Sequence, residues 1–124
     1  MNPLSIKGTM KTPTILSDTD KGVIEIRGRS NPENANAFYK PLIEWIDEYV
    51  KNPVDKTTVN LELEYFNTTS SKCILSLLKK LESSKDSTRD VIVNWYYEKD
   101  DYDERETGEF YEKMTELSFN FIGI

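Results

Sequence analysis

Hydrophobic residues along the chain switch between the two-residue repeat of a strand and the wider repeat of a helix. The clearest strand pattern is Thr58–Phe66, whose residues expected on one face are Val59, Leu61, Leu63 and Tyr65. Shorter strands are predicted at Val23–Arg27, Val91–Tyr97 and Phe119–Ile122. A short stretch containing Ile15 and Leu16 runs through the turn-rich residues 17–22 into Val23–Arg27, which predicts a hairpin.

The first predicted helix begins at Ser30, because Pro32 and Glu33 complete a capping box with proline in the first turn. Its apolar positions at helical spacing are Phe38, Leu42, Trp45, Ile46 and Tyr49. Pro41 lies inside this repeat, so we expect the helix to kink or split there. Asn52 and Pro53 are expected to end it.

Two more helices follow. One begins in the polar cluster 67–71 and has its apolar stripe at Ile74, Leu77, Leu78 and Leu81. The other is expected to run through Phe110, Met114 and Leu117. The predicted order is β-β-α-β-α-β-α-β, which indicates an α/β domain with a mixed, mostly parallel sheet, a hairpin at its start and helices covering at least one face.

Composition narrows the function. The chain has 124 residues, a length typical of one domain. We expect this domain at residues 12–124, preceded by an N-terminal tail at residues 1–11 that can be flexible. One Cys excludes an internal disulfide, and the absence of His excludes Ser-His-Asp catalysis and His-containing zinc sites. No apolar run reaches the roughly 18 residues of a membrane span, and residues 1–11 do not resemble a secretory signal. We therefore expect a cytoplasmic protein without cofactor, and its net charge of −6 disfavours nucleic-acid or membrane binding.

The negative charge is concentrated in residues 98–106, which hold six acidic and two basic side chains. The segment lacks the glycine and the closing glutamate of a calcium loop, so we expect no metal site there. A solvated face and a docking surface for a basic partner both fit this segment.

The junction between a strand and a helix at Asn67-Thr68-Thr69-Ser70-Ser71 places four hydroxyls where backbone N–H groups are unpaired and the helix dipole is positive. A phosphate on one of them would be well placed and would add about −1.5 to −2 charge. Ordinary helix capping explains the same residues. Cys73, one turn further on, is expected to pack in the core rather than to serve redox chemistry.

Three long motifs resemble the SiaC family of bacterial regulatory phosphoproteins. They are Ile24–Ala35 (IEIRGRSNPENA) followed by Phe38–Pro41, then Leu63–Lys72 (LEYFNTTSSK), then Val93–Glu98 (VNWYYE). The acidic segment with Gly108 and the end of the chain around Phe119 follow the same layout, so the resemblance spans residues 12–122.

The resemblance implies a domain similar to the STAS fold of anti-sigma factor antagonists, with no enzymatic activity. It implies that a serine/threonine kinase of the anti-sigma type phosphorylates Thr68 and that a PP2C-like phosphatase removes the phosphate. The unphosphorylated form would bind a diguanylate cyclase and promote cyclic-di-GMP synthesis, as in biofilm regulation. Thr69 stands where the family usually has Ser, so Thr69, Ser70 and Ser71 stay alternative acceptors.

Candidate partner-binding residues cluster by topology, because the carboxyl ends of parallel strands share one edge of a sheet. At this edge we expect the turn after Val23–Arg27, the Thr68 junction and the loop after Tyr97. The candidates are Arg27, Arg29, Asn31, Glu33, Asn34, Tyr65, Asn67, Ser70, Ser71 and Lys72. Arg27 and Arg29 could hold a phosphate or a partner carboxylate through bidentate bonds, or pair with local acids.

Two other functions compete with cyclase activation. One is an anti-sigma factor antagonist in a sigma-factor partner switch. The other is a small enzyme that uses carboxylates such as Glu62, Glu64 or Asp100, of which the first two share the polar face of one strand about 7 Å apart. The chain offers no nucleophile–base pair and no phosphate-binding glycine loop, which disfavours the enzyme.

Overall fold

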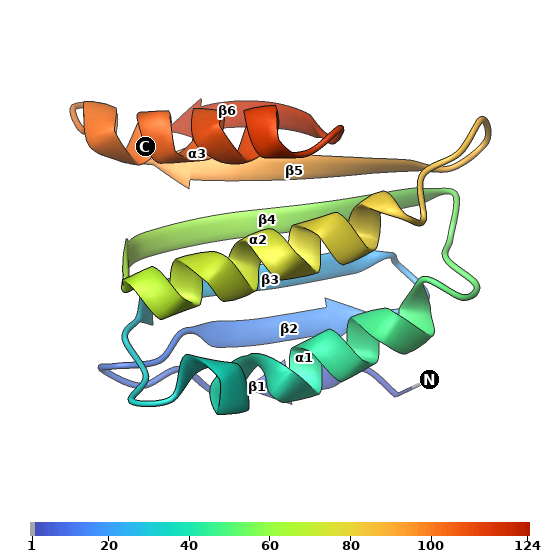
Figure 1. Cartoon of the computed structure of the whole chain (residues 1–124), viewed down its shortest axis with the longest axis horizontal. Coiled ribbons are helices and arrows are strands. Elements are labelled where there is room, and N and C mark those ends of the chain that lie inside the picture. The colour runs from blue at the N-terminus through green and yellow to red at the C-terminus, as the bar shows by residue number, and fades with distance from the viewer. Residues whose placement is uncertain (1) are drawn as a thin grey trace.

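In the computed structural model, which describes residues 2–124, a six-stranded sheet runs β1 to β6 in chain order (Figure 1). The elements are β1 (Leu4–Ile6), β2 (Thr14–Asp18), β3 (Val23–Ser30), α1 (Ala35–Tyr49), β4 (Lys56–Phe66), α2 (Thr68–Glu82), β5 (Asp90–Tyr97), α3 (Tyr102–Met114) and β6 (Ser118–Gly123). Strands β1 to β3 pair antiparallel and β3 to β6 pair parallel. The predicted fold class and the hairpin are confirmed.

The sequence pattern predicts a tail at residues 1–11, but the structure has strand β1 within this segment. Leu4 pairs with Ser17 and Ile6 with Ile15, so this segment forms the edge of the sheet. Trp45 of α1 also donates from its indole nitrogen to the Asn2 carbonyl at 3.1 Å. A strand of three residues is too short for its hydrophobic pattern to be recognised in the sequence. Pairing with β2 and contact with α1 define it instead.

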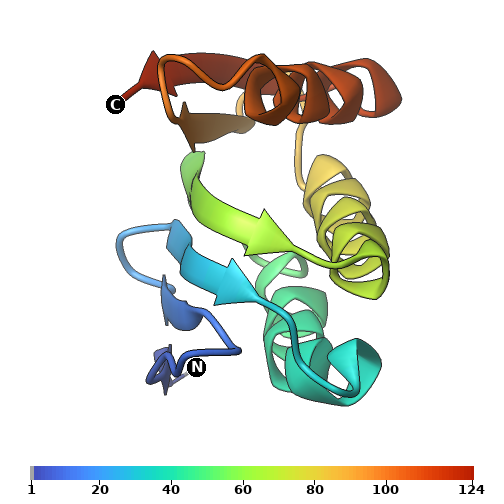
Figure 2. The ribbon, with the colours of Figure 1, turned by 90° about the vertical axis from the view of Figure 1, so that its left-hand side faces the viewer.

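The three helices all cover the same face of the sheet (Figure 2). Each parallel strand is added beside the previous one, so right-handed crossovers place every helix on one side. The core lies between this face and the helices and includes Ile24, Ile26, Val59, Leu61, Val93, Leu77 and Leu81. The opposite face of the sheet is left without a covering helix in the described chain (Figure 2).

The start of α1 differs from the prediction. Asn34 is the N-cap, and its side chain accepts from the Ala37 N–H at 3.1 Å, whereas Ser30 ends β3 and is buried. The predicted kink or split at Pro41 is also wrong, since α1 continues through it to Tyr49. Pro41 and Ala37 are both exposed, so water can satisfy the carbonyl that loses its helical partner.

A bulge in β4 accounts for another difference. Val59, Leu61 and Leu63 are buried on one face as predicted, but Tyr65 is 44% exposed. The pairing with β3 shifts so that Gly28 faces Leu63 and Arg29 faces Tyr65, which leaves Glu64 as the extra residue. The alternation therefore reverses, and Tyr65 turns away from the core.

Helix α3 packs through residues other than those expected. Phe110 is 51% exposed and Met114 is also exposed, while Gly108 and Tyr111 face the core. A side chain at position 108 would lie 2.7 Å from the Trp95 ring, so the glycine lets α3 approach β5 closely. Leu117 is buried, as the pattern suggested, although it lies beyond the end of the helix.

Candidate functional site

The candidate site lies where β3 and β4 end side by side and the chain turns into α1 and α2. The Asn67 N–H donates to the Ser30 carbonyl at 3.0 Å, which ties the two strand ends together. The Asn67 side-chain amide donates to Asn31 Oδ1 at 3.1 Å and to the Pro32 carbonyl at 3.4 Å. Asn67 thus joins the two turns that the sequence placed at one edge.

Asn67 is also the N-cap of α2, because its Oδ1 accepts from the Ser70 N–H at 2.8 Å. Thr68 is therefore the first residue of the helix, and both Thr68 and Thr69 are exposed. Lys72 is exposed one turn after Thr68, at the spacing that makes two helix residues neighbours.

The two serines of the hydroxyl run are held by buried tyrosines. Tyr39 donates to Ser30 Oγ at 2.6 Å, Ser30 Oγ donates to Ser70 Oγ at 2.8 Å, and Ser70 Oγ donates to the Ser30 carbonyl at 3.3 Å. Ser70 has 0% exposure. We call Ser30, Tyr39 and Ser70 the buried hydroxyl chain.

A second tyrosine holds Ser71 from the other side of α2. The Ser71 Oγ and the Tyr111 hydroxyl are 2.7 Å apart, and Tyr111 donates to the Ser71 carbonyl at 3.1 Å. Burial raises the pKa of Tyr39 and of Tyr111 to about 12, so both phenols stay protonated near neutral pH. No sequence pattern identified these two tyrosines as neighbours of the hydroxyl run.

The structure separates the two arginines that the sequence grouped. Arg27 lies on the uncovered face of the sheet, where it pairs with Glu25 at 3.4 Å and with Glu62 at 3.1 Å. This matches the pairing with local acids that was one of its two interpretations. Arg29 is exposed beside the bulge, with its guanidinium 5.2 Å from the centre of the Tyr65 ring.

The remaining candidates lie in the turn between β3 and α1. Asn31, Glu33 and Asn34 are all exposed, and of these Asn31 contacts the α2 N-cap while Asn34 caps α1. The surface around Thr68 is therefore polar and accessible, whereas Ser70 is fully buried and Ser71 only half-exposed.

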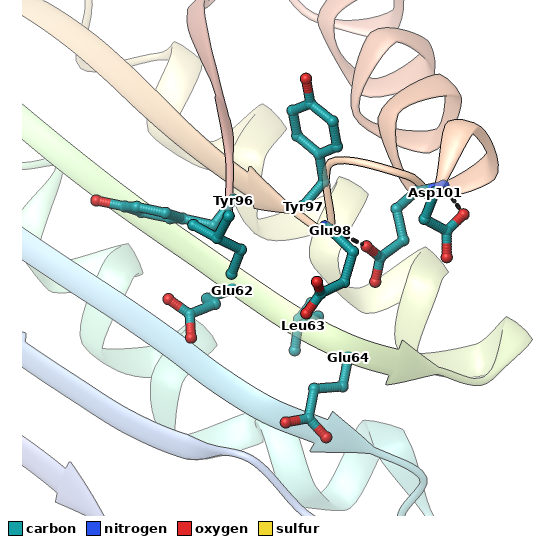
Figure 3. Close-up of a pocket in the computed structure, with 9 residues that line it drawn as sticks. Glu62, Leu63, Glu64, Tyr96, Tyr97, Glu98 and Asp101 are labelled. Atoms are coloured by element: carbon teal, nitrogen blue, oxygen red, sulfur yellow. Dashed lines mark hydrogen bonds between the residues drawn. The ribbon is translucent and has the colours of Figure 1, made fainter.

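The acidic segment reaches the same edge of the sheet and forms a hollow of about 260 Å³ (Figure 3). Glu62 and Glu64 of β4 line it together with Glu98, Asp101 and Glu104. Burial, and then neighbouring carboxylates, raise the pKa of Glu104, whose Oε2 accepts from the Glu98 N–H at 2.7 Å. Asp100 does not line the hollow.

The hollow is negatively charged and contains no nucleophile–base pair. Apart from two tyrosines, the ionisable side chains among its described lining residues are all carboxylates. Among residues 2–124, no group of three or more His, Cys, Asp or Glu side chains is placed to hold a metal ion. Cys73 is buried in the core, and burial raises the pKa of its thiol, which disfavours a reactive thiolate.

The helices of the described chain are too short or too polar to cross a membrane.

Comparisons with known proteins agree on one family. The model of the "SiaC family regulatory phosphoprotein" matches residues 6–124. An uncharacterised protein of Pseudomonas aeruginosa strain UCBPP-PA14 is 31% identical over 99 residues, which cover 80% of this chain and 79% of the relative.

Solved structures give the same result. Apo-SiaC from Pseudomonas aeruginosa matches with a TM-score of 0.88 and 28% identity over 99% of this chain and 100% of that one. A chain in the crystal structure of the diguanylate cyclase SiaD in complex with its activator SiaC, also from Pseudomonas aeruginosa, matches with a TM-score of 0.90 and 27% identity over 98% and 99%.

Proposed function

The chain belongs to the SiaC family of regulatory phosphoproteins, and we propose that its unphosphorylated form binds and activates a diguanylate cyclase in the cytoplasm. The observation that carries this proposal is the match over nearly the whole chain to the activator in the cyclase complex. In this function the protein is a binding partner and not itself an enzyme. Its candidate contact residues surround Thr68 and include Arg29, Asn31 and Tyr65.

Thr68 is the proposed phosphoacceptor. It is exposed at the first position of α2, where the helix dipole favours an added anion and the exposed Lys72 lies one turn away. The resemblance to the SiaC family supports the same residue as the acceptor. A serine/threonine kinase of the anti-sigma type and a PP2C-like phosphatase complete the proposed switch.

Phosphorylation would end cyclase binding without refolding the domain. The phosphate makes the net charge more negative, from −6 to roughly −8, at one exposed position on the proposed contact surface. A dianion in an interface must be desolvated and repels acidic partner groups. A loss of about 3 kcal/mol of binding free energy lowers affinity more than a hundredfold.

The experiment compares the wild type with Thr68→Ala, Thr68→Glu and the control Thr69→Glu, using a diguanylate cyclase from the same host. Binding is measured by calorimetry and activation by the rate of cyclic-di-GMP formation. We expect the wild type and Thr68→Ala to bind and activate, and Thr68→Glu to lose affinity more than Thr69→Glu. Binding of an anti-sigma factor with no effect on any cyclase would contradict the proposal and favour the antagonist.

A further inference from the structure

We propose that Tyr39 and Tyr111 are positioning residues that restrict phosphorylation to the two threonines of the hydroxyl run, because they hold Ser70 inside the fold and bind the hydroxyl of Ser71. This inference rests on the proposed function, since it concerns the choice of acceptor in the same modification. The sequence shows four adjacent hydroxyls of similar chemistry, and only the structure distinguishes them.

The argument begins with what phosphate transfer requires of an acceptor. The hydroxyl oxygen must reach the γ-phosphorus of ATP in line with the leaving group, and its proton must pass to a base of the kinase. A bond forms between that oxygen and phosphorus while the bond to the bridging oxygen breaks, and ADP leaves with the electron pair. An acceptor whose oxygen is buried and whose proton is already donated meets neither requirement.

Ser70 fails both conditions. Its Oγ accepts from Ser30 Oγ and donates to the Ser30 carbonyl, and its side chain has no exposure. Ser30 in turn accepts from Tyr39, which reaches it from α1 and is itself fully buried. Every hydroxyl proton of the buried hydroxyl chain is thus donated within it, so Ser70 leaves it only if the first turn of α2 opens.

Ser71 is only half-buried, and a hydrogen bond to a tyrosine on the opposite side of α2 holds its hydroxyl. Its Oγ lies 2.7 Å from the Tyr111 hydroxyl, and since Tyr111 donates to the Ser71 carbonyl, the Ser71 hydroxyl is the donor in that contact. Tyr111 comes from α3 and is fully buried. The first turn of α2 is therefore bound on one flank through α1 and on the other through α3, while Thr68 and Thr69 face solvent.

The chain supplies a matched control for the loss of a buried tyrosine hydroxyl. Tyr49 is buried at the far end of α1, and its hydroxyl lies 2.7 Å from Thr57 Oγ1. Tyr49→Phe therefore removes the same kind of hydrogen bond as Tyr39→Phe, at a distance from the hydroxyl run. Both variants keep the aromatic ring and its packing.

The experiment maps phosphate by mass spectrometry on wild type, Tyr39→Phe, Tyr111→Phe and Tyr49→Phe purified from the protein's own host. We expect wild type and Tyr49→Phe to carry phosphate only on the threonines. Tyr39→Phe should carry phosphate on Ser70 and Tyr111→Phe on Ser71, where the wild type carries none, because the loss of one hydrogen bond makes the released hydroxyl about tenfold more populated. Phosphate on Ser70 or Ser71 of the wild type, or unchanged site distributions in both variants, would overturn the inference.

A second measurement separates this inference from the proposed function. If wild type carries no phosphate at all, the phosphorylation switch is wrong, and amide hydrogen exchange of the first turn of α2 then decides the inference. Faster exchange at Ser70 and Ser71 in Tyr39→Phe and Tyr111→Phe than in Tyr49→Phe supports the positioning role. Equal exchange in all three variants contradicts it.

Discussion

Replacing Asn67 with alanine should weaken the site more than an ordinary helix cap would, because Asn67 has two roles. Its Oδ1 accepts from the Ser70 N–H at 2.8 Å and caps α2. Its Nδ2 donates to Asn31 Oδ1 and to the Pro32 carbonyl, which connects α2 to the turn before α1. Asn67→Ala removes both sets of contacts and leaves the backbone bond to Ser30 in place.

The expected magnitude follows from these contacts. Loss of an N-cap side chain costs about 1 kcal/mol, and loss of the amide donor costs about another 1 kcal/mol. For a domain of 124 residues, a total of about 2 kcal/mol corresponds to a fall in Tm of about 8 °C.

Asn34→Ala is the matched control, since Asn34 caps α1 through one exposed contact to the Ala37 N–H at 3.1 Å. It should cost about 1 kcal/mol, or about 4 °C. Asn67→Asp keeps the capping acceptor and loses the Nδ2 donors, so it should lie between wild type and Asn67→Ala. Urea and thermal unfolding followed by circular dichroism measure all three. Equal losses for Asn67→Ala and Asn34→Ala would refute the two-role explanation.

Three further predictions concern the fold around the site. Gly108→Ala should cost about 1–3 kcal/mol and shift Trp fluorescence, because the new methyl group would lie 2.7 Å from the Trp95 ring; an unchanged stability measured by urea unfolding would contradict the close approach. Stability should fall as pH rises from about 10 to about 12, because the unfolded chain releases the Tyr39 and Tyr111 protons that the folded chain retains up to a pKa of about 12. In unfolding titrations at pH 9 and pH 11.5, Tyr39→Phe should show a smaller loss than wild type. Gly28→Ala should lower the free energy of unfolding, measured by calorimetry, by about 1–2 kcal/mol. Gly28 has φ +113°, and a Cβ there would meet nothing closer than 3.7 Å, so the loss comes from the strained backbone conformation and not from a clash.

The sequence predicted the parts of the fold that depend on local pattern. The alternation from Thr58 to Leu63, the hairpin and the strand–helix order appear in the structure, because burial on one face repeats at the period of the element. The meeting of the Asn31 turn and the Thr68 junction also follows from topology, since parallel strands end at one edge.

Other features depend on contacts between distant residues, which a local pattern does not encode. The outward turn of Tyr65 results from a bulge, and bulges change the alternation without an obvious signal in a single sequence. Phe110 and Met114 looked like core residues, but the absence of a side chain at Gly108 sets which side of α3 faces Trp95. Tyr39 and Tyr111, which hold Ser70 and Ser71, lie about 30 and 40 positions away from them, on α1 and α3.

The bulge also sets the direction in which α2 begins. Because Glu64 has no partner on β3, Phe66 turns toward the core, where its ring lies 6.4 Å from that of Trp95. Asn67 then reaches the Ser30 carbonyl with its N–H, and Thr68 follows on the solvent side. If β4 alternated strictly to its end, Phe66 would face the uncovered side of the sheet. The start of α2 would then be shifted by one residue relative to the two faces of the sheet. The exposure of Thr68 therefore depends on the extra residue Glu64 upstream and on the shift in pairing that follows Gly28 and Leu63.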